Sequence, residues 1–325
     1  MKVSDRVDID LLDTLATFTN VRLGEMHTVE DIAVAAGKWA TSMPVPPVRD
    51  DVVIENLEIP GVEAEGTIRL RVYRPAGAPV SEGLPCLYWI HGGGMIMGSP
   101  EQDDFLCQEY VGRAGCVVVS VDYRLAPTYP FPGGLNDCYT GLEWLSTHAA
   151  ELGVDSRRIA VGGASAGGGL AAALTLYIRD HGGPSVVFQQ LIYPMLDDRN
   201  TTPSSREFIG NTVVWSRENN VAAWNALLQG KAGGEDVSTY AAPARATDLA
   251  NLPPAYIHVG ELDLFRDEDV DYAIRLLQAG VATELHVHPG AIHGWDVYAP
   301  NSEGSQRALR DLIDSFIRST ALERV

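Results

Sequence analysis

One serine of the sequence has the neighbours that a catalytic nucleophile needs. Ser165 stands between Gly163 and Gly167 in a Gly-x-Ser-x-Gly pattern. The apolar run Arg158–Val161 precedes this pattern, and a helical stretch, Gly168–Asp180, follows it. On such a strand-to-helix turn the serine oxygen projects from the sheet, and the glycines let strand and helix approach without a β-carbon clash. We therefore predict that Ser165 is the nucleophile of an acyl transfer; the alternative is a glycine-rich helix start that packs or binds an anion.

A second glycine-rich segment has the composition of an oxyanion hole. A His-Gly-Gly-Gly run occupies residues 91–94, directly after the apolar run Pro85–Ile90. Backbone N–H groups aimed at the oxygen of a tetrahedral intermediate stabilise its charge, and glycine lets the backbone come close. The N–H of Ala166, the residue after the nucleophile, is expected to join them. We expect His91 to order the loop by hydrogen bonding; the alternative is a glycine-rich turn beside a core histidine.

An acid and a base follow the serine along the chain in the order serine, acid, histidine, which is the order known from proteins that carry this Gly-x-Ser-x-Gly turn. Asp263 comes shortly after the apolar run Ala255–Val259, and His293 follows the strand pattern Glu284–Val287 through a short loop. An imidazole can take the serine proton at neutral pH and return it to the leaving group, while a carboxylate fixes its tautomer. We predict that His293 is the general base and Asp263 its orienting acid.

Other residues could fill these two roles. His288 is the alternative base, although it precedes the loop rather than lying in it. Asp267 is the alternative acid, but it opens a helical pattern, where a carboxylate near the N-terminus already has a structural reason. His258 lies within an apolar run, and we interpret it as a packed residue.

The elements that must position these residues alternate between strands and helices. Residues Val52–Pro75 alternate between apolar and polar side chains around Pro60-Gly61, which predicts an antiparallel hairpin. Later apolar runs have the continuous pattern of strands that are buried on both faces. These runs are Pro85–Ile90, Cys116–Val121, Arg158–Val161, Val186–Ile192 and Ala255–Val259, and helical patterns cover Asn136–Ala150, Gly167–Asp180 and Asp267–Ala279. The alternation predicts an α/β fold with a mostly parallel, doubly wound sheet.

Two segments fit this alternation poorly and are expected to form a helical cap over the site. Residues 1–48 have a helical pattern that ends in a proline-rich stretch, and residues 198–234 carry Trp215 and Trp224 among turn formers. Long insertions between core strands tend to be functional lids, and the alternative is simple surface packing. The predicted core then comprises residues 49–197 and 235–325.

The charge of the chain argues against two classes of partner. Lys and Arg total 24 against 43 Asp and Glu among 325 residues, which gives a formal net charge of −19. Nucleic acid and anionic membranes would be repelled by this charge. The acidic start lacks the pattern of a secretory signal, and no window has the roughly 20 consecutive apolar residues of a membrane helix. We therefore expect a cytoplasmic protein that does not bind nucleic acid or membranes.

Cysteine and histidine spacing gives no support for a metal site. Cys86, Cys107, Cys116 and Cys138 form neither a C-x-x-C pair nor zinc-ligand spacing, so we expect buried free thiols. His286 and His288 would share one face of a strand, but no third ligand is evident. No metal is predicted.

The sequence resembles a known family, the bacterial relatives of hormone-sensitive lipase, or family IV esterases, which have the α/β-hydrolase fold. The resemblance extends from about Val52 to about Trp295. It rests on the two glycine motifs, on residues 122–127 (Asp-Tyr-Arg-Leu-Ala-Pro), on residues 131–137 and on the acid segment 263–268. Residues 240–252 and 272–280 are most similar to the branch of the family that contains heroin esterase, an acetyl-ester hydrolase.

The resemblance implies a helical cap, no cofactor and a preference for small-molecule esters with short acyl chains. It assigns the triad to Ser165, Asp263 and His293 and the oxyanion donors to Gly93, Gly94 and Ala166. Relatives commonly dimerise, so a homodimer is also implied, although the sequence marks no self-complementary surface. Two departures stand out: Ala164 replaces a common acidic residue before the nucleophile, and Leu264-Phe265 replaces a proline and a leucine after the acid.

These observations lead to a carboxylic-ester hydrolase that acts through an acyl-enzyme. Amidase, lactonase and carbamate hydrolase activities would use the same groups and stay open as alternatives. A ligand-binding protein is a further alternative, since plant relatives include receptors without the catalytic histidine, and a peptidase would need an additional gating domain. Met95, beside the oxyanion loop, and Trp215, in the expected cap, are our candidates for substrate contact.

Overall fold

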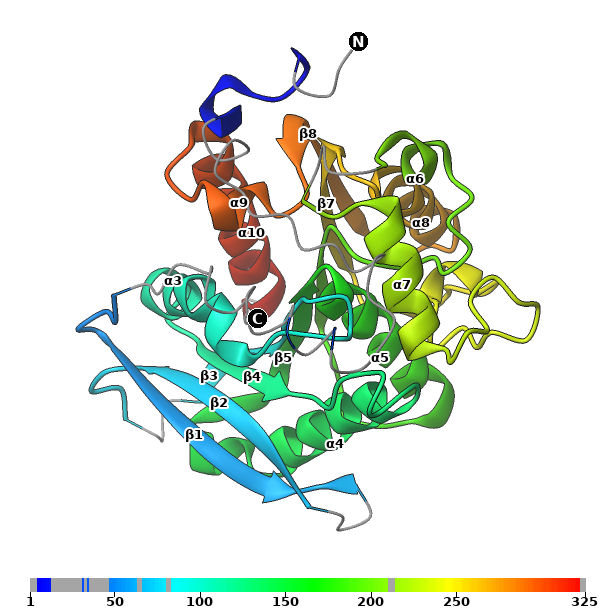
Figure 1. Cartoon of the computed structure of the whole chain (residues 1–325). Helices are drawn as coiled ribbons and strands as arrows, with labels where there is room; N and C mark the ends of the chain where they lie inside the picture. The colour runs from blue at the N-terminus through cyan, green and yellow to red at the C-terminus, as the bar shows by residue number, and fades with distance from the viewer. Residues whose placement is uncertain are drawn as a thin grey trace.

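A single sheet runs through the part of the chain that the structure describes. The structure is a computed structural model, and it describes residues 5–12, 31, 34, 47–62, 66–79, 83–209 and 214–321. The eight strands of the sheet follow the order β1-β2-β4-β3-β5-β6-β7-β8 (Figure 1). They are β1 Val52–Pro60, β2 Thr67–Pro75, β3 Leu84–Ile90, β4 Val117–Asp122, β5 Val154–Ala164, β6 Phe188–Ile192, β7 Ala255–Leu262 and β8 Thr283–Ile292.

The sheet is antiparallel at one edge and parallel elsewhere. β1 pairs with β2 and β2 with β4 in antiparallel fashion, whereas β3 pairs in parallel with β4 and β5, and the order continues in parallel to β8. The alternation in β2 buries Ile68, Leu70 and Val72 and leaves the intervening arginines partly exposed. β3 is instead buried from Cys86 to Ile90, as its continuous apolar run requires. The predicted hairpin and doubly wound sheet are confirmed.

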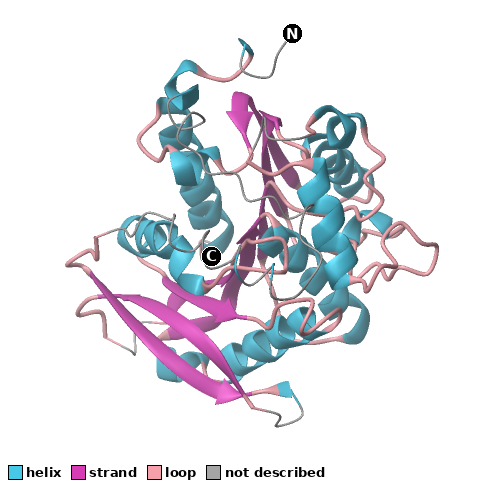
Figure 2. Cartoon of the chain, viewed as in Figure 1, coloured by secondary structure: helices cyan, strands magenta, loops and turns pink. Residues whose placement is uncertain are grey.

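Helices cover both faces of the sheet (Figure 2). α3 (Asp104–Ala114) and α10 (Glu303–Thr320) pack against each other on one face. α4 (Gly133–Thr147) and α5 (Ala166–His181) pack against each other on the opposite face, where α8 (Arg266–Gln278) covers β7 and β8. Short elements complete the description: η2 Ile9–Leu11, η6 Pro100–Asp103, η7 Ala149–Leu152, α6 Pro203–Glu207, α7 Arg217–Leu227, η9 Pro243–Arg245 and α9 Trp295–Tyr298.

Two strands are longer than their sequence patterns predict. β5 does not end at Val161 but continues to Ala164, because Gly162 and Gly163 pair with both β3 and β6. β8 does not end at Val287; it continues to Ile292, after an irregularity in its pairing with β7. In β5 the neighbouring strands hold an extended backbone where local propensity favours a turn. In β8 Gly290 keeps a φ of 68°, and the pairing with β7 resumes at Ile292.

The candidate functional residues converge at one edge of the sheet. Ser165, Asp263 and His293 each follow the last residue of a parallel strand, and the glycine run 92–94 comes shortly after β3. The carboxyl ends of parallel strands lie on the same side, which is where open α/β sheets bind ligands. Residues distant in the sequence are therefore brought to one place.

The predicted cap is only partly visible. Most of residues 1–48 lie outside the described ranges, whereas the insertion 198–234 is described except for residues 210–213 and contains α6 and α7. None of the helices in the described ranges is long and apolar enough to span a bilayer. Across these same ranges, no group of three or more His, Cys, Asp or Glu side chains is placed to hold a metal ion.

Candidate active site

The backbone of Ser165 has the strained conformation of a nucleophile turn. Its φ of 56° and ψ of −119° lie outside the common regions for a residue with a side chain, a strain of about 1–3 kcal/mol that the surroundings must hold. A β-carbon on Gly167 would lie 1.9 Å from the carbonyl oxygen of Ile90, and one on Gly163 would lie 2.4 Å from the Gly167 carbonyl. Both flanking positions therefore require glycine, as the sequence pattern predicts.

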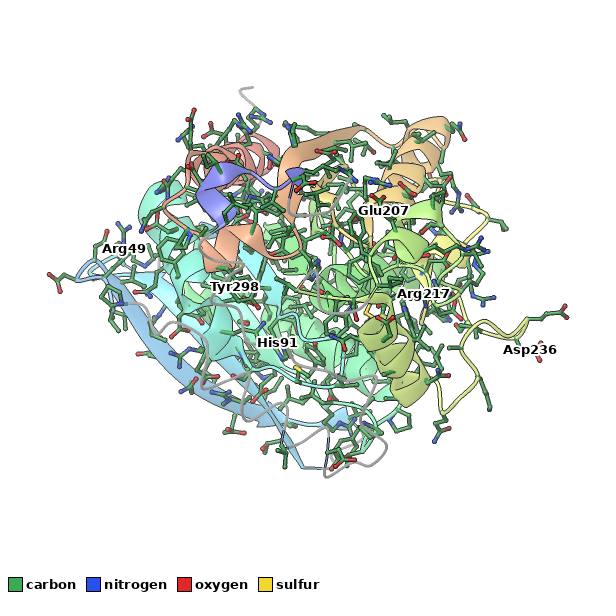
Figure 3. The ribbon with its side chains drawn as sticks, turned by 45° about the horizontal axis from the view of Figure 1, so that its top comes forward. Arg49, His91, Glu207, Arg217, Asp236 and Tyr298 are labelled. Atoms are coloured by element: carbon green, nitrogen blue, oxygen red, sulfur yellow. The ribbon has the colours of Figure 1, made fainter. Side chains whose placement is uncertain are left out.

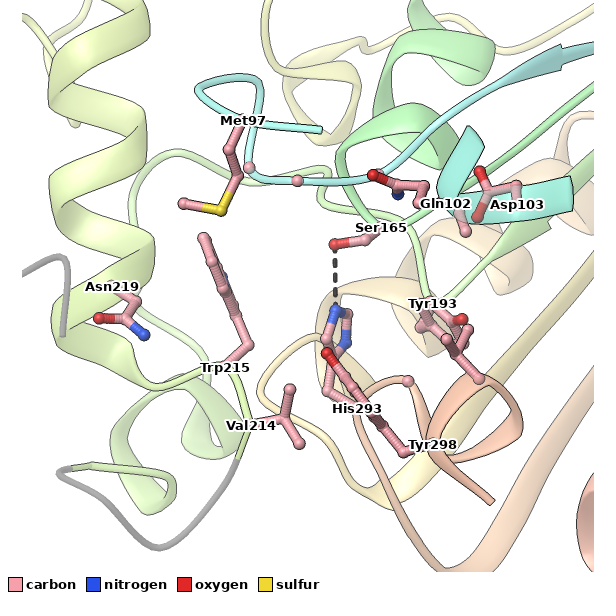
Figure 4. A pocket seen from close by; sticks show the side chains of 16 residues that line it. Met97, Gln102, Asp103, Ser165, Tyr193, Val214, Trp215, Asn219, His293 and Tyr298 are labelled. Carbon is pink, nitrogen blue, oxygen red and sulfur yellow. Dashed lines mark hydrogen bonds between the residues drawn. The ribbon is translucent and has the colours of Figure 1, made fainter. Parts of the chain in front are cut away.

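Two hydrogen bonds join the three predicted triad residues. His293 Nδ1 lies 2.7 Å from Asp263 Oδ2, and His293 Nε2 lies 3.0 Å from Ser165 Oγ (Figure 4). An ionised carboxylate only accepts, so Nδ1 carries the ring proton and Nε2 accepts from the serine hydroxyl. This tautomer leaves Nε2 ready to remove the serine proton.

The carboxylate of Asp263 is fully buried and has a second donor. The backbone N–H of Phe265 donates to Oδ1 at 3.0 Å, which leaves Oδ2 for His293. The Phe265 ring meets the His293 ring edge to face at 5.3 Å between centroids. The unusual residues after the acid therefore preserve the loop: Phe265 fixes the carboxylate with its N–H and the imidazole with its ring.

The alternative base His288 and the alternative acid Asp267 both lie apart from the hydrogen-bonded triad. His288 is buried, its Nε2 has no hydrogen-bond partner within the described ranges, and its ring packs on Trp295 at 4.9 Å. Burial lowers the pKa of His288 to about 4. Asp267 accepts from the backbone N–H of Ser204 at 2.7 Å and from Arg266 Nε at 2.8 Å. Neither contacts the serine–histidine pair.

The glycine run forms a tight loop beside the serine. Gly93 has a φ of 116°, and a β-carbon there would lie 2.1 Å from the Met97 carbonyl oxygen. Gly94 has a φ of 63°, and a β-carbon there would lie 2.6 Å from the indole of Trp215. Both glycines line the pocket that contains Ser165, and Ala166 begins α5 next to it. The backbone can therefore approach a substrate oxygen at this place.

His91 supports that loop from inside the molecule (Figure 3). Its Nδ1 donates to the Gly92 carbonyl oxygen at 2.8 Å, and its ring stacks on Tyr123 at 4.2 Å. The Tyr123 hydroxyl donates back to the His91 carbonyl oxygen at 2.9 Å. Burial lowers the pKa of His91 to about 4, so the ring is neutral. These contacts agree with the expectation that His91 orders the loop.

A pocket with about 690 Å³ of empty space, its open mouth included, contains the serine and histidine. Its described lining combines the three glycines of the loop with apolar, aromatic and polar side chains. The lining residues are Gly92, Gly93, Gly94, Met97, Gln102, Asp103, Ala164, Ser165, Tyr193, Val214, Trp215, Asn219, His293, Gly294, Val297 and Tyr298. The serine and histidine therefore lie in a pocket that is open to solvent and accessible to a ligand.

The two candidates for substrate contact lie in different places. Trp215 lines the pocket, and its Nε1 donates to Asn220 Oδ1 at 3.1 Å. Met95 is buried and is not among the described lining residues; the left-handed turn at this residue, with a φ of 63°, places Met97 in the lining instead. Met97 rather than Met95 is therefore the methionine of the described pocket lining.

The sequence patterns missed several polar and aromatic lining residues. Tyr193 directly follows β6 and packs against His293 at 4.7 Å between ring centroids. Its position at the carboxyl end of a parallel strand is a signal that could have identified it. Gln102 and Asp103 belong to a short 3-10 helix after the oxyanion loop, and no sequence motif marks them.

The fold and the site geometry define the class of the protein as an α/β hydrolase. A family model described as "alpha/beta hydrolase fold" matches residues 87–297, and the chain belongs to this family. The resemblance to the bacterial relatives of hormone-sensitive lipase is thereby confirmed.

Named relatives cover most of the chain. Carboxylesterase NlhH of Mycobacterium tuberculosis is 36% identical over 306 residues, which are 90% of this chain and 91% of that protein. Esterase LipI of the same organism is 35% identical over 272 residues, 84% of each chain. A solved structure of a bacterial heroin esterase has a TM-score of 0.92 and 37% identity and covers 99% of this chain and 100% of its own. The similarity therefore extends over the whole fold.

Proposed function

We propose that the protein hydrolyses carboxylic esters with short acyl chains, with Ser165 as nucleophile, His293 as general base and Asp263 as the acid that orients the base. The observation that carries this proposal is the pair of hydrogen bonds from Asp263 through His293 to Ser165 at the floor of a pocket. The carboxylesterase class itself follows from the family and from relatives that are named esterases. Its substrates are accordingly small-molecule esters.

The arrangement supports a two-step reaction. As Ser165 Oγ attacks the ester carbonyl carbon, its proton moves to His293 Nε2 and the carbonyl oxygen becomes an oxyanion. The N–H groups of Gly93, Gly94 and Ala166 are the proposed donors to that oxyanion. When the carbon–oxygen bond breaks, His293 gives its proton to the leaving alcohol and an acyl-enzyme stays on Ser165. Water, deprotonated by His293, then attacks the acyl carbon and releases the acid.

The preference for short acyl chains rests on the packing of the insertion against the oxyanion loop. The indole of Trp215 lies directly over Gly94, and Met97 and Val214 line the same part of the pocket. Large apolar side chains in contact with the loop limit the length of chain that can lie beside the serine. Trp215 is therefore our proposed contact for the acyl or alcohol group.

We also propose that the N-terminal segment and residues 198–234 form a cap. Arg6 pairs with Glu207 of α6 and also with Glu261, whose carboxylate accepts from Arg6 at 3.0 Å. Asp8 N–H donates to the Gly290 carbonyl oxygen at 3.0 Å. These contacts connect the start of the chain with the insertion, with the end of β7 and with the last residues of β8, which precede His293.

Amide, lactone and carbamate hydrolysis would use the same residues, and a homodimer stays an expectation from the resemblance. A protein that only binds ligands is disfavoured by the presence of His293 and its contacts with both partners. The test is the hydrolysis of p-nitrophenyl esters from acetate to palmitate by the wild type and by Ser165→Ala. We expect rapid turnover of the short esters and a loss of several orders of magnitude in kcat for the variant.

The outcome separates the alternatives. If a folded Ser165→Ala protein retained the activity, Ser165 would not be the nucleophile. If the wild type were inactive on every p-nitrophenyl ester but hydrolysed an anilide or a lactone, the triad would stand and the preference for open-chain esters would be wrong. Thermal unfolding of the variant provides the check that the protein is folded.

A further inference from the structure

The pocket has an apolar side and a polar side with respect to Ser165. Figure 4 shows the two groups of labelled side chains on opposite sides of the serine hydroxyl. Met97, Val214 and Trp215 lie on one side, which is mostly apolar and also carries the amide of Asn219, and Gln102, Asp103 and Tyr193 lie on the other. The triad and the oxyanion loop do not account for the polar side.

Asp103 is the charged residue of this polar side. Its side chain lines the pocket although the residue is only 7% exposed. Trp89 Nε1 donates to Asp103 Oδ2 at 2.7 Å. Burial, with a smaller contribution from the neighbouring carboxylates Asp296 and Asp104, raises the pKa of Asp103 to about 7 against the opposing effect of the Trp89 hydrogen bond. A carboxyl group is therefore held beside the reacting serine in an environment that penalises its negative charge.

A second carboxyl group stands behind the polar side. Asp296, in α9, accepts from the Tyr193 hydroxyl at 2.9 Å, and burial raises its pKa as well. Asp104, the first residue of α3, is already paired with Arg71 at 2.9 Å. The titratable and charged groups that face Asp103 from the surrounding elements are Asp104 and Cys107 of α3, Tyr123 after β4, Tyr193 after β6 and Asp296 of α9. The charges that act on Asp103 most strongly are thus negative.

We propose that this polar side binds a cationic group of the substrate, so that the enzyme prefers esters that carry a protonated or quaternary amine. The inference rests on the proposed ester hydrolysis and adds a substrate class to it. A positive charge beside Asp103, with Asp296 behind Tyr193, would favour the ionised form of the Asp103 carboxyl group in a region of low dielectric. Tyr193 and Tyr298 line the same pocket, and aromatic faces attract ammonium groups.

The competing explanation is that Asp103 serves only as the acceptor for Trp89 and as a negative group before the N-terminus of α3. The two explanations differ in what Asp103→Asn should do. An asparagine oxygen can still accept from Trp89, but it carries no charge. Asp314→Asn is the matched control, because Asp314 is exposed on α10 and its substitution removes the same charge from the molecule.

The experiment compares esters that have the same shape and differ in charge. One pair is acetylcholine and its neutral isostere 3,3-dimethylbutyl acetate, in which a tert-butyl group replaces trimethylammonium. The other pair is p-nitrophenyl esters whose acyl chains end in trimethylammonium or in tert-butyl. The readout is the ratio of kcat/KM for the cationic and the neutral member, measured within each protein at about pH 8, where Asp103 is mostly ionised.

We expect at least one pair to show a ratio well above unity in the wild type and a fall of about tenfold in Asp103→Asn. Asp314→Asn should leave the ratio near the wild-type value. Ratios that are equal in the wild type and in Asp103→Asn for both pairs would overturn the inference, and so would an equal fall in both variants. Good turnover of the neutral esters with no charge preference would leave the proposed ester hydrolysis intact and reject only the cation site.

A second measurement does not depend on the folding of a variant. Tetramethylammonium should inhibit the wild type competitively when the substrate is the neutral ester, because it occupies the polar side alone. Its uncharged isostere, neopentane, or tert-butanol should inhibit more weakly at equal concentration. Equal inhibition by the charged and uncharged compounds would contradict a site for a cation.

Discussion

At the scale of single residues, the orientation of Asp263 decides whether the proposed base can act. Both carboxylate oxygens are occupied, Oδ1 by the Phe265 N–H and Oδ2 by His293 Nδ1. The first hydrogen bond prevents rotation of the carboxylate, and the second selects the imidazole tautomer. Because the residue is fully buried, no solvent competes for these positions.

Asp263→Asn should reduce kcat by about 10³–10⁴-fold while the fold is retained. The Phe265 N–H would keep the amide oxygen at the place of Oδ1, so the amide NH₂ would face His293 Nδ1. The ring would then carry its proton on Nε2 and could not accept from Ser165. Steady-state kinetics on a short p-nitrophenyl ester measures the effect.

Asp267→Asn is the control for that prediction, because Asp267 is the alternative acid and its oxygens bind Ser204 and Arg266 instead. It should change kcat by far less than Asp263→Asn. A larger loss for Asp267→Asn than for Asp263→Asn would exchange the roles of the two aspartates.

The sequence could predict the side chains of this site but not the backbone groups that hold them. Ser165, Asp263 and His293 follow from chain order and strand ends, since their chemistry lies in their side chains. The N–H of Phe265 acts irrespective of residue type, so no pattern marks it. Asp103 also escaped prediction, because its proximity to Ser165 arises from packing between segments about 60 residues apart in the chain.

At the scale of elements, hydrophobic periodicity located the central strands and the helices between them, but it misplaced some ends. The sequence pattern predicts a turn at Gly162 and Gly163. In the structure these residues extend β5, because β3 and β6 pair with them. α10 was not singled out, although the buried residues Leu309, Leu312, Ile313 and Phe316 have helical spacing that could have identified it. α3 buries Gln108 and Glu109 beside Tyr110 and Val111, and this mixed run has no clear period.

The first turn of α7 holds one wall of the pocket. The buried Ser216 is the N-cap of this helix and accepts from the Asn219 N–H at 3.3 Å. Trp215 directly precedes the cap, and Asn219 lies in the first turn; both line the pocket. The cap therefore positions two of the residues that would meet a substrate.

Ser216→Ala should weaken this turn by about 1 kcal/mol and raise KM, while kcat stays near the wild-type value. The reason is that Trp215 and Asn219 lose their fixed positions, whereas the triad is built on other elements. Ser302→Ala is the matched control, because Ser302 caps α10 through the Ser305 N–H at 3.2 Å. It should lower the thermal stability by a similar amount and leave KM unchanged. An equal rise of KM in both variants would refute a specific role for the cap of α7.

At the scale of the whole molecule, two sets of carboxyl groups have opposite effects on how the free energy of unfolding depends on pH. Hydrogen bonds from arginines lower the pKa of Glu101 and of Asp155 to about 2, so their ion pairs are lost as the pH falls toward that value. Burial instead raises the pKa of Asp103 to about 7 and those of Glu268 and Asp269 well above the usual range. The first group destabilises the fold in acid, and the second destabilises it as the pH rises.

The direction in which Asp103 changes stability with pH follows from the number of protons that it binds in the folded and the unfolded state. Between about pH 4 and about pH 7 the folded protein keeps the proton on Asp103 and the unfolded chain does not, so stability falls as the pH rises through this range. The net charge of −19 at pH 7 adds repulsion in the same direction, whereas the sequence pI is about 4.7. The melting temperature should therefore be higher near pH 5 than near pH 8 and should fall again below about pH 4.

Calorimetry of the wild type and of Asp103→Asn across this range tests the argument. The variant removes the buried charge and keeps an acceptor for Trp89, so it should melt at a higher temperature than the wild type near pH 8. The difference should shrink as the pH falls and disappear below about pH 4, where the wild-type carboxyl group is protonated in both states. A variant that is less stable than the wild type by the same amount at every pH would show that Asp103 acts through its shape and hydrogen bond, and that its burial imposes no charge penalty.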